Sequence, residues 1–232
     1  MIVHKCVQGS DEWLRLRLGI PTASRFDSIV TPKKMGLSAA SKGYAHELLA
    51  EWIYGEPLEA FVSPWMERGE ALEAEAVRYF ELETGLDTSK VGFITTDDGM
   101  IGASPDRLIG DDGTIEQKCP SPKVHVGYMI DPHSLVEDYQ LQVQGQLWVS
   151  ERRFAYVQSY CPRFPSVIVR VERKEDYITD LSLCVRSFVD VLLAARIKLS
   201  QEYGDFHVRQ PIRAMPPSLT DDEFDALSRP VV

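Results

Sequence analysis

The chain has 232 residues, of which 44% are hydrophobic, and a formal net charge of −10. This length and apolar content predict one domain with a substantial core, spanning residues 1–232. No apolar run approaches the roughly 20 residues of a membrane span, and the first residues lack the apolar centre of a signal peptide, so we expect no membrane association and a cytoplasmic location.

The cysteine spacing and the charge distribution argue against two kinds of functional site. The four cysteines are far apart and form no CxxC pair, which argues against a zinc or iron–sulfur site. Residues 51–116 carry sixteen acidic and four basic side chains, whereas residues 1–50 carry four acidic and seven basic ones. This pattern excludes a broad basic surface for nucleic acid. It still allows binding through local phosphate contacts and through divalent cations held by the central acids.

The N-terminal segment predicts two short helices with a basic junction. The first helix begins at Ser10 or Asp11 and ends by Gly19. The second begins at Thr22 or Ser24, and the free N–H groups of its first turn are suited to a phosphate. Three arginines flank the junction, although arginines on short helices are usually only solvated: Arg15, Arg17 and Arg25.

Two longer helices are predicted before the middle of the chain. Residues 33–38 are expected to be a loop, and residues 41–54 an amphipathic helix closed by Gly55. Residues 64–84 form the next helix, with proline in its first turn and glycine after its end. Glu73 falls in the middle of the apolar face of this helix. A carboxylate aimed at a core needs a partner, so Glu73 is either half of a buried ion pair or a metal ligand.

Asp106 lies just before a predicted β-hairpin. Two short runs with apolar residues flank the Gly/Asp cluster at residues 110–113, which is typical of a hairpin turn. Side chains alternate along a strand, so Glu116 and Lys118 face the same side. If Asp106 on the partner strand faces that side too, two carboxylates and one ammonium group converge.

This convergence would suit metal-assisted hydrolysis of a phosphodiester. Two carboxylates with open positions fit a hard cation such as Mg²⁺ or Mn²⁺, and a nearby lysine can orient or activate a water for attack on phosphorus. The same spacing also occurs by chance in acidic proteins, where Glu116 and Lys118 would form a solvated face. A glycosidase-like use of Asp106 and Glu116 is a further alternative, but Lys118 and the lack of a nearby aromatic sugar platform argue against it.

The C-terminal half predicts an irregular stretch to residue 132 and then a helix from Leu135 to about Ser150, opened by a capping box at residues 134–137. One face of this helix carries Tyr139, Gln142, Val143 and Gln146. Gln142 has the reach to hold a water or a phosphate oxygen. Two strands, a long helix and an extended arm follow, at residues 153–161, 166–172, 176–201 and 205–232. The expected core residues of the long helix are Leu183, Val185, Phe188, Val191, Leu192 and Ile197.

Four blocks of the chain together carry a family resemblance. They read WLRLRLGIPTAS (13–24), RGEALE (68–73), SPD…EQKCP (104–120) and YQLQVQGQLW (139–148). In this order they resemble the lambda-exonuclease, or YqaJ-type viral recombinase, family of the PD-(D/E)xK nuclease superfamily. The resemblance implies an α/β (α+β) fold, in which a mixed central β-sheet is flanked by helices.

The resemblance also implies the roles of individual residues. Two Mg²⁺ or Mn²⁺ ions would be bound by Asp106, Glu116, the backbone carbonyl of Gln117 and Glu73. Lys118 would position or activate the water, and Gln142 would assist at the reacting centre. The residues that would hold the 5′ phosphate and the DNA are Trp13, Arg17, Ser24, Met66 and Ser104. Met66 stands where a family member has a leucine that helps to part the strands.

The implied activity is 5′-to-3′ digestion of the 5′-ended strand of linear duplex DNA, which leaves 3′ single-stranded overhangs for recombination. The implied assembly is a ring-shaped homotrimer around DNA that works with a single-strand-annealing protein, in a bacterium or a phage. One alternative is an endonuclease or repair nuclease of the same superfamily. The other is a DNA-end-binding protein without catalysis, against which the intact Asp106, Glu116 and Lys118 argue.

Overall fold

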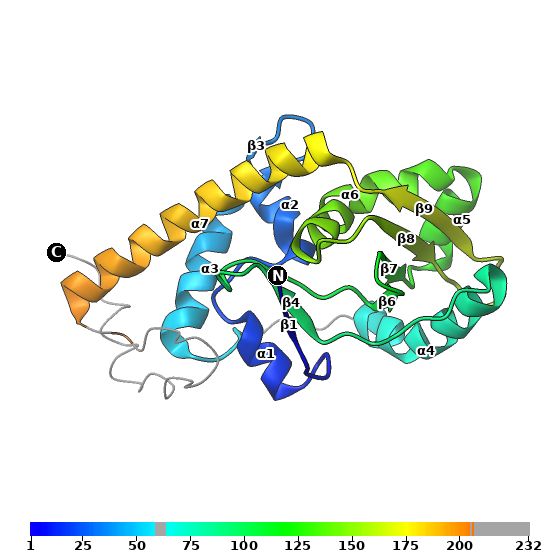
Figure 1. The fold of residues 1–232 in the computed structure, drawn as a ribbon, viewed down its shortest axis with the longest axis horizontal. Helices are drawn as coiled ribbons and strands as arrows, with labels where there is room; N and C mark the ends of the chain where they lie inside the picture. The colour runs from blue at the N-terminus through cyan, green and yellow to red at the C-terminus, as the bar shows by residue number, and fades with distance from the viewer. Residues whose placement is uncertain (59–63, 205, 207–232) are drawn as a thin grey trace.

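The computed structural model describes residues 1–58, 64–204 and 206, and for residues 64–70 it describes the backbone alone. Its helices are α1 (Asp11–Arg17), the 3₁₀ turn η1 (Ala23–Arg25), α2 (Phe26–Ile29), α3 (Ser41–Tyr54), α4 (Pro64–Thr84), α5 (Pro122–Ile130), α6 (Pro132–Val149) and α7 (Glu175–Tyr203). Its strands are β1 (Ile2–His4), β2 (Val30–Thr31), β3 (Gly36–Leu37), β4 (Phe93–Thr95), β5 (Gly102–Ala103), β6 (Arg107–Ile109), β7 (Gly113–Lys118), β8 (Phe154–Ser159) and β9 (Val167–Glu172). Figure 1 shows their arrangement.

The largest sheet contains the predicted hairpin. Its strand order is β6-β7-β8-β9, with β7 and β8 parallel and the other pairs antiparallel. Helix α6 lies along one face and α4 lies along the other (Figure 1). Ile115 faces α4 and packs against Phe80, whereas its neighbour Glu116 faces α6. The predicted mixed sheet flanked by helices is therefore confirmed, and so is the predicted alternation along β7.

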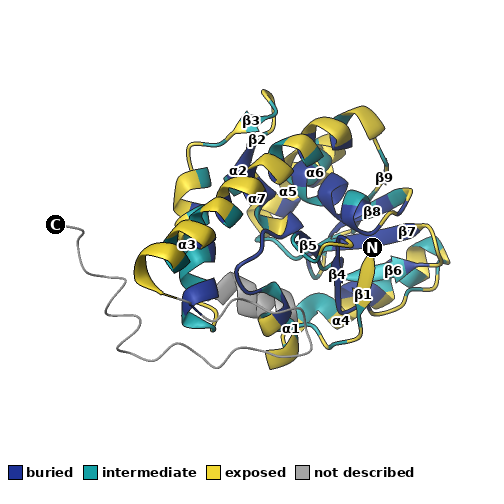
Figure 2. Cartoon of the chain, turned by 60° about the vertical axis from the view of Figure 1, so that its left-hand side comes forward, coloured by how far each residue is buried: buried dark blue, intermediate teal, exposed yellow. Residues whose placement is uncertain are grey.

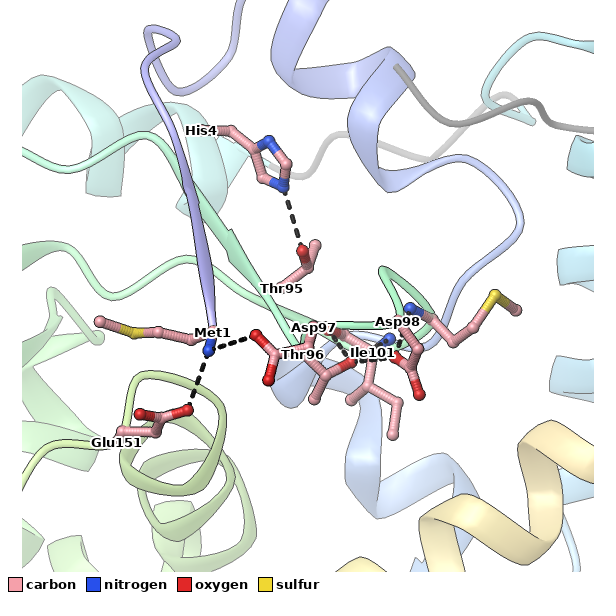
Figure 3. A network of polar contacts seen from close by, with 9 residues as sticks. Met1, His4, Thr95, Thr96, Asp97, Asp98, Ile101 and Glu151 are labelled. Atoms are coloured by element: carbon pink, nitrogen blue, oxygen red, sulfur yellow. Dashed lines mark hydrogen bonds and ion pairs between the residues drawn. The ribbon is translucent and has the colours of Figure 1, made fainter. Parts of the chain in front are cut away.

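A smaller antiparallel sheet, of order β1-β4-β5, brings the N-terminal strand beside residues 93–95. The two segments approach closely at Gly92, where an added Cβ atom would lie 2.5 Å from the carbonyl oxygen of His4 and 2.4 Å from that of Cys6. Figure 3 shows the polar contacts of this sheet. The amino group of Met1 lies 2.7 Å from Asp97, and the His4 ring lies 3.0 Å from the Thr95 hydroxyl.

The main core lies where α2, α3, α6 and α7 meet, and Figure 2 shows the buried strands β7 and β8 beside the buried part of α6. Three of the residues expected in the core from α7 are buried there, namely Val185, Phe188 and Leu192. The other three expectations are wrong, because only one stripe of α7 contacts the domain and the rest of the helix faces outward. The exposed side chains are Leu183, Val191 and Ile197.

Several local elements also differ from the sequence prediction. The stretch expected to be irregular contains α5, since Ser121 caps it by accepting a hydrogen bond from the Val124 N–H and Pro122 occupies its first turn. Helix α6 starts at Pro132 rather than Leu135, because Asp131 accepts the His133 N–H and is the cap. The predicted loop at residues 33–38 includes β3, which pairs with β2.

Helix bounds at residues 41–54 and 64–84 agree with the prediction. The predicted arm at residues 205–232 lies outside the described residues apart from Phe206, whose ring centroid is 5.9 Å from that of Trp52. Within the described part of the chain, every helix is too short or too polar to cross a bilayer.

Candidate active site

Asp106, Glu116 and Lys118 converge at the β6–β7 hairpin, as predicted. Asp106 lies immediately before β6, and one of its carboxylate oxygens accepts the backbone N–H of Gln117 at 2.5 Å. On β7, the ammonium group of Lys118 lies 2.7 Å from a carboxylate oxygen of Glu116. The hairpin therefore supplies both carboxylates and the ammonium group from a stretch of 13 residues, 106–118.

Helix α6 fixes the orientation of Glu116. The Gln142 side-chain amide donates to one Glu116 carboxylate oxygen at 2.6 Å, and the Gln146 amide donates to the other at 2.6 Å. Gln142 also accepts a hydrogen bond from Lys118 at 3.1 Å, and the Lys118 ammonium lies 4.4 Å from the centroid of the Tyr139 ring. The family resemblance implies a role for Gln142 at this centre, whereas the sequence gives no role to Gln146, which is buried.

The electrostatics of the cluster follow from this geometry. Burial and the nearby Glu116 charge raise the pKa of Asp106 well above its usual value, and Glu73 adds to the rise. Burial alone would lower the pKa of Lys118, but Glu116 and Asp106 outweigh it and the pKa is raised. Burial and the Glu116 charge together therefore disfavour a negative charge on Asp106 more than Lys118 and the Gln117 N–H favour it.

Glu73 reaches this site from helix α4. It lines the same cavity as Asp106. A chain of hydrogen bonds sets the position of α4 against the sheet. The Gln117 amide donates to Gln158 at 2.6 Å, and Gln158 donates to the carbonyl oxygen of Ala76, which follows Glu73 by three residues on the helix. Gln158 is fully buried, so this link belongs to the framework of the site.

The residues present fit a divalent cation. The repulsion between Asp106 and Glu116 is what a bound cation would relieve, and oxygen ligands are the type that Mg²⁺ and Mn²⁺ prefer. Among the described residues, no three His, Cys, Asp or Glu side chains are grouped closely enough to form a cation cage by themselves. Mg²⁺ is commonly held by one or two carboxylates, with water and substrate phosphate as the remaining ligands.

The predicted phosphate-binding residues also come together. The Trp13 indole N–H donates to the Ser104 hydroxyl at 2.9 Å, and the Arg17 guanidinium lies 4.1 Å from the centroid of the Trp13 ring. Arg17 lies 3.5 Å from the Thr22 hydroxyl, which is 3.3 Å from that of Ser24. This cluster, which we term the end cluster, adjoins Asp106 because Ser104 is two residues before it. The side chain of Met66 lies outside the described residues.

The end cluster combines the Arg17 guanidinium with the hydroxyl groups of Thr22, Ser24 and Ser104. Burial lowers the pKa of Arg17, and within the described residues its guanidinium forms no ion pair. The Glu51 carboxylate opposes this effect only in part, so a partly buried cation without a direct ion pair would be stabilised by an external anion. The helix start predicted at Thr22 or Ser24 is the short turn η1, with Thr22 at its cap position.

Comparisons with known proteins identify the family of this chain. The model of the YqaJ-like viral recombinase domain matches residues 12–153. An alkaline exonuclease from Laribacter hongkongensis, LHK-Exo, is 31% identical, with a TM-score of 0.75, over 83% of this chain and 97% of its own; its complex with dAMP matches equally. A phage-related exonuclease from Haemophilus somnus 129PT is 15% identical, with a TM-score of 0.61, over 76% of this chain and 96% of its own, and shares the fold.

A search of curated proteins finds no match. The family match covers more than half of the chain, and it includes the end cluster, both carboxylates of the hairpin and Lys118. The LHK-Exo structure shares the fold of this chain over 83% of its residues. The chain therefore belongs to the YqaJ-like viral recombinase domain family and is a nuclease of the exonuclease type.

Proposed function

We propose that this nuclease digests the 5′-ended strand of linear duplex DNA, starting from a phosphorylated end, and leaves 3′ overhangs for recombination. The observation that carries the proposal is the end cluster beside Asp106, with Trp13 hydrogen-bonded to Ser104 and Arg17 stacked on Trp13. A terminal phosphate bound by Arg17 would bring an adjacent phosphodiester to the carboxylates. An enzyme that cuts within a strand has no need of such a site.

The proposal includes two Mg²⁺ or Mn²⁺ ions, held by Asp106, Glu116, the Gln117 carbonyl and Glu73. When bound, the ions would neutralise charge on the reacting phosphate and make the attacking water more acidic. Lys118 would donate hydrogen bonds that orient this water. Gln142 accepts a hydrogen bond from Lys118 and donates one to Glu116, and it would hold these two groups in fixed positions relative to each other. Gln146 would hold the second Glu116 oxygen in place.

We further propose that the chain forms a homotrimer, works with a single-strand-annealing protein and releases mononucleotides. A ring-shaped homotrimer and a single-strand-annealing partner follow from the family resemblance alone, and light scattering of the purified chain tests the first. Release of mononucleotides is supported by the relative LHK-Exo, whose structure was determined in complex with dAMP, a deoxynucleoside monophosphate.

Digestion of defined DNA substrates with Mg²⁺ tests the proposal. The substrates are a linear duplex with a 5′ phosphate, the same duplex with a 5′ hydroxyl, and a covalently closed circle. We expect shortening of the 5′-ended strand, preference for the phosphate, an intact circle and no cleavage by Lys118→Ala. Cutting of the circle would favour an endonuclease. Binding of DNA without metal-dependent cleavage of any substrate would favour a DNA-end-binding protein.

A further inference from the structure

The loop between α1 and η1 is held by side chains from two helices that lie far along the chain. This loop joins Arg17 to Thr22, two members of the end cluster. Within it, the Gly19 N–H donates to the Glu51 carboxylate on α3 at 3.1 Å, and the Gly19 carbonyl accepts a hydrogen bond from the Arg196 guanidinium on α7. Both polar groups of one backbone residue are therefore fixed from outside the loop.

The position of Gly19 requires a glycine for two reasons. Its φ is 68°, a left-handed conformation that residues with a side chain rarely adopt. An added Cβ atom would also lie 2.9 Å from the Trp52 Cβ and 3.1 Å from the Leu48 carbonyl oxygen, and both of these residues belong to α3. The loop therefore lies directly against α3 and has little room to shift toward it.

The two side chains that hold Gly19 are themselves held in place. Arg196 is 8% exposed, and its guanidinium lies 5.2 Å from the centroid of the Trp52 ring. Helices α3 and α7, which carry Trp52 and Arg196, pack side by side (Figure 1). Burial raises the pKa of Glu51, although the Gly19 N–H, the strongest opposing influence, favours the charged form. A partly buried carboxylate and a buried guanidinium thus share Gly19 as a partner.

We propose that Glu51 and Arg196 are positioning residues for recognition of the 5′ phosphate. By fixing Gly19, they set the path of the chain from α1 to η1, and therefore the position of the Arg17 guanidinium relative to the Thr22 hydroxyl. This inference rests on the proposed function and names residues that would give it its end specificity. Neither side chain needs to touch the phosphate, because both act through the backbone of the loop. A misplacement of about 1 Å can cost about 100-fold in rate, so a modest shift of the loop would be measurable.

The test measures kcat/KM of the purified full chain on a linear duplex with a 5′ phosphate and on the same duplex with a 5′ hydroxyl. The ratio of the two values reports recognition of the phosphate, and it does not depend on the fraction of the protein that is folded. The variants are Glu51→Leu, Glu51→Gln and Arg196→Met. Val171→Ala is the control for lost stability, because Val171 is a buried residue of β9 that packs in a different part of the core.

We expect Glu51→Leu and Arg196→Met each to lower this ratio about tenfold, because each removes one of the two hydrogen bonds to Gly19. Glu51→Gln keeps the wild-type ratio, since its side-chain carbonyl can still accept the Gly19 N–H, and Val171→Ala keeps it too.

A wild-type ratio in Glu51→Leu or in Arg196→Met would overturn the positioning role of that residue. A ratio in Glu51→Gln as low as that in Glu51→Leu would also overturn it for Glu51, because charge rather than the hydrogen bond would then be responsible. Equal rates of the wild-type chain on the two duplexes would instead overturn the proposed recognition of a 5′ phosphate, on which the positioning role depends.

Discussion

Replacement of Arg17 by glutamine tests whether the end cluster recognises a terminal phosphate. The guanidinium stacks on Trp13 at 4.1 Å, is partly buried, and has no ion-pair partner among the described residues. Glutamine preserves a polar side chain, although a shorter one, and removes the charge and the forked donor geometry that suits a phosphate. We therefore expect a loss that depends on the presence of the 5′ phosphate.

The size of this loss follows from the type of contact. A hydrogen bond between a charged side chain and its partner contributes about 1.5–3 kcal/mol, so losing the Arg17 contact costs about 2 kcal/mol of binding in the transition state. That corresponds to roughly a 30-fold decrease in kcat/KM on the phosphorylated duplex. On the 5′-hydroxyl duplex the contact is missing from the start, so the same substitution lowers kcat/KM by less than about threefold.

The assay is a two-by-two cycle of protein variant against end chemistry, read as kcat/KM from strand shortening. Arg15→Gln is the control, because Arg15 lies on the same helix and is exposed. Arg15→Gln removes one charge without changing the end cluster. The ratio of kcat/KM on the 5′-phosphorylated duplex to kcat/KM on the 5′-hydroxyl duplex is therefore expected to stay at the wild-type value. If Arg17→Gln lowered both rates by the same factor, Arg17 would support the fold or the DNA in general, and the reasoning about a terminal phosphate would fail.

Two further substitutions test the framework of the site. Gln146→Leu removes one amide donor from Glu116 and is expected to raise the Mg²⁺ concentration for half-maximal cleavage about tenfold or more. Gln144→Leu is the control on the same helix. Because Gln144 is hydrogen-bonded to the backbone of Glu172 and Lys174, this variant lowers stability without shifting the Mg²⁺ requirement. An unchanged Mg²⁺ requirement in Gln146→Leu would refute its positioning role. Gly92→Ala forces a methyl group against two carbonyl oxygens and destabilises the chain by about 2 kcal/mol or more, measured by urea unfolding; a stability equal to wild type would contradict the close approach.

The catalytic hairpin was predictable because its signals are local. A Gly/Asp turn between two short apolar runs fixes the β6–β7 pairing, and the period of two along β7 places Glu116 and Lys118 on one face. Helix α4 was equally clear, since proline and glycine mark its ends. Two of the groups proposed to take part in the chemistry, Glu116 and Lys118, can therefore be placed together before any tertiary contact is known.

The features that the sequence did not predict depend on tertiary contacts or on local residues that fit more than one structure. The pairing of β1 with β4 joins residues about 90 positions apart, and strands of two or three residues carry little pattern of their own. A serine followed by a proline is as typical of a loop after a strand as of a helix start, so the sequence did not predict α5 at Ser121 and Pro122. Gln146 gains its role only when α6 packs on the sheet and brings its amide to Glu116.

The acidic character of the chain leads to a last expectation, on how divalent cations affect DNA binding. A protein that binds DNA through a broad basic surface binds more weakly as Mg²⁺ is added, because the ion competes for the phosphates. Here few basic side chains lie near the site. The carboxylates of Asp106 and Glu116 repel a phosphate unless a metal ion lies between the carboxylates and that phosphate. Binding of a 5′-phosphorylated duplex by Lys118→Ala, measured by fluorescence anisotropy, is therefore expected to strengthen about tenfold between chelator and millimolar Mg²⁺. Steady weakening over that range would mean that DNA is held by surface charge, and that the carboxylates do not bind the ion together with the substrate.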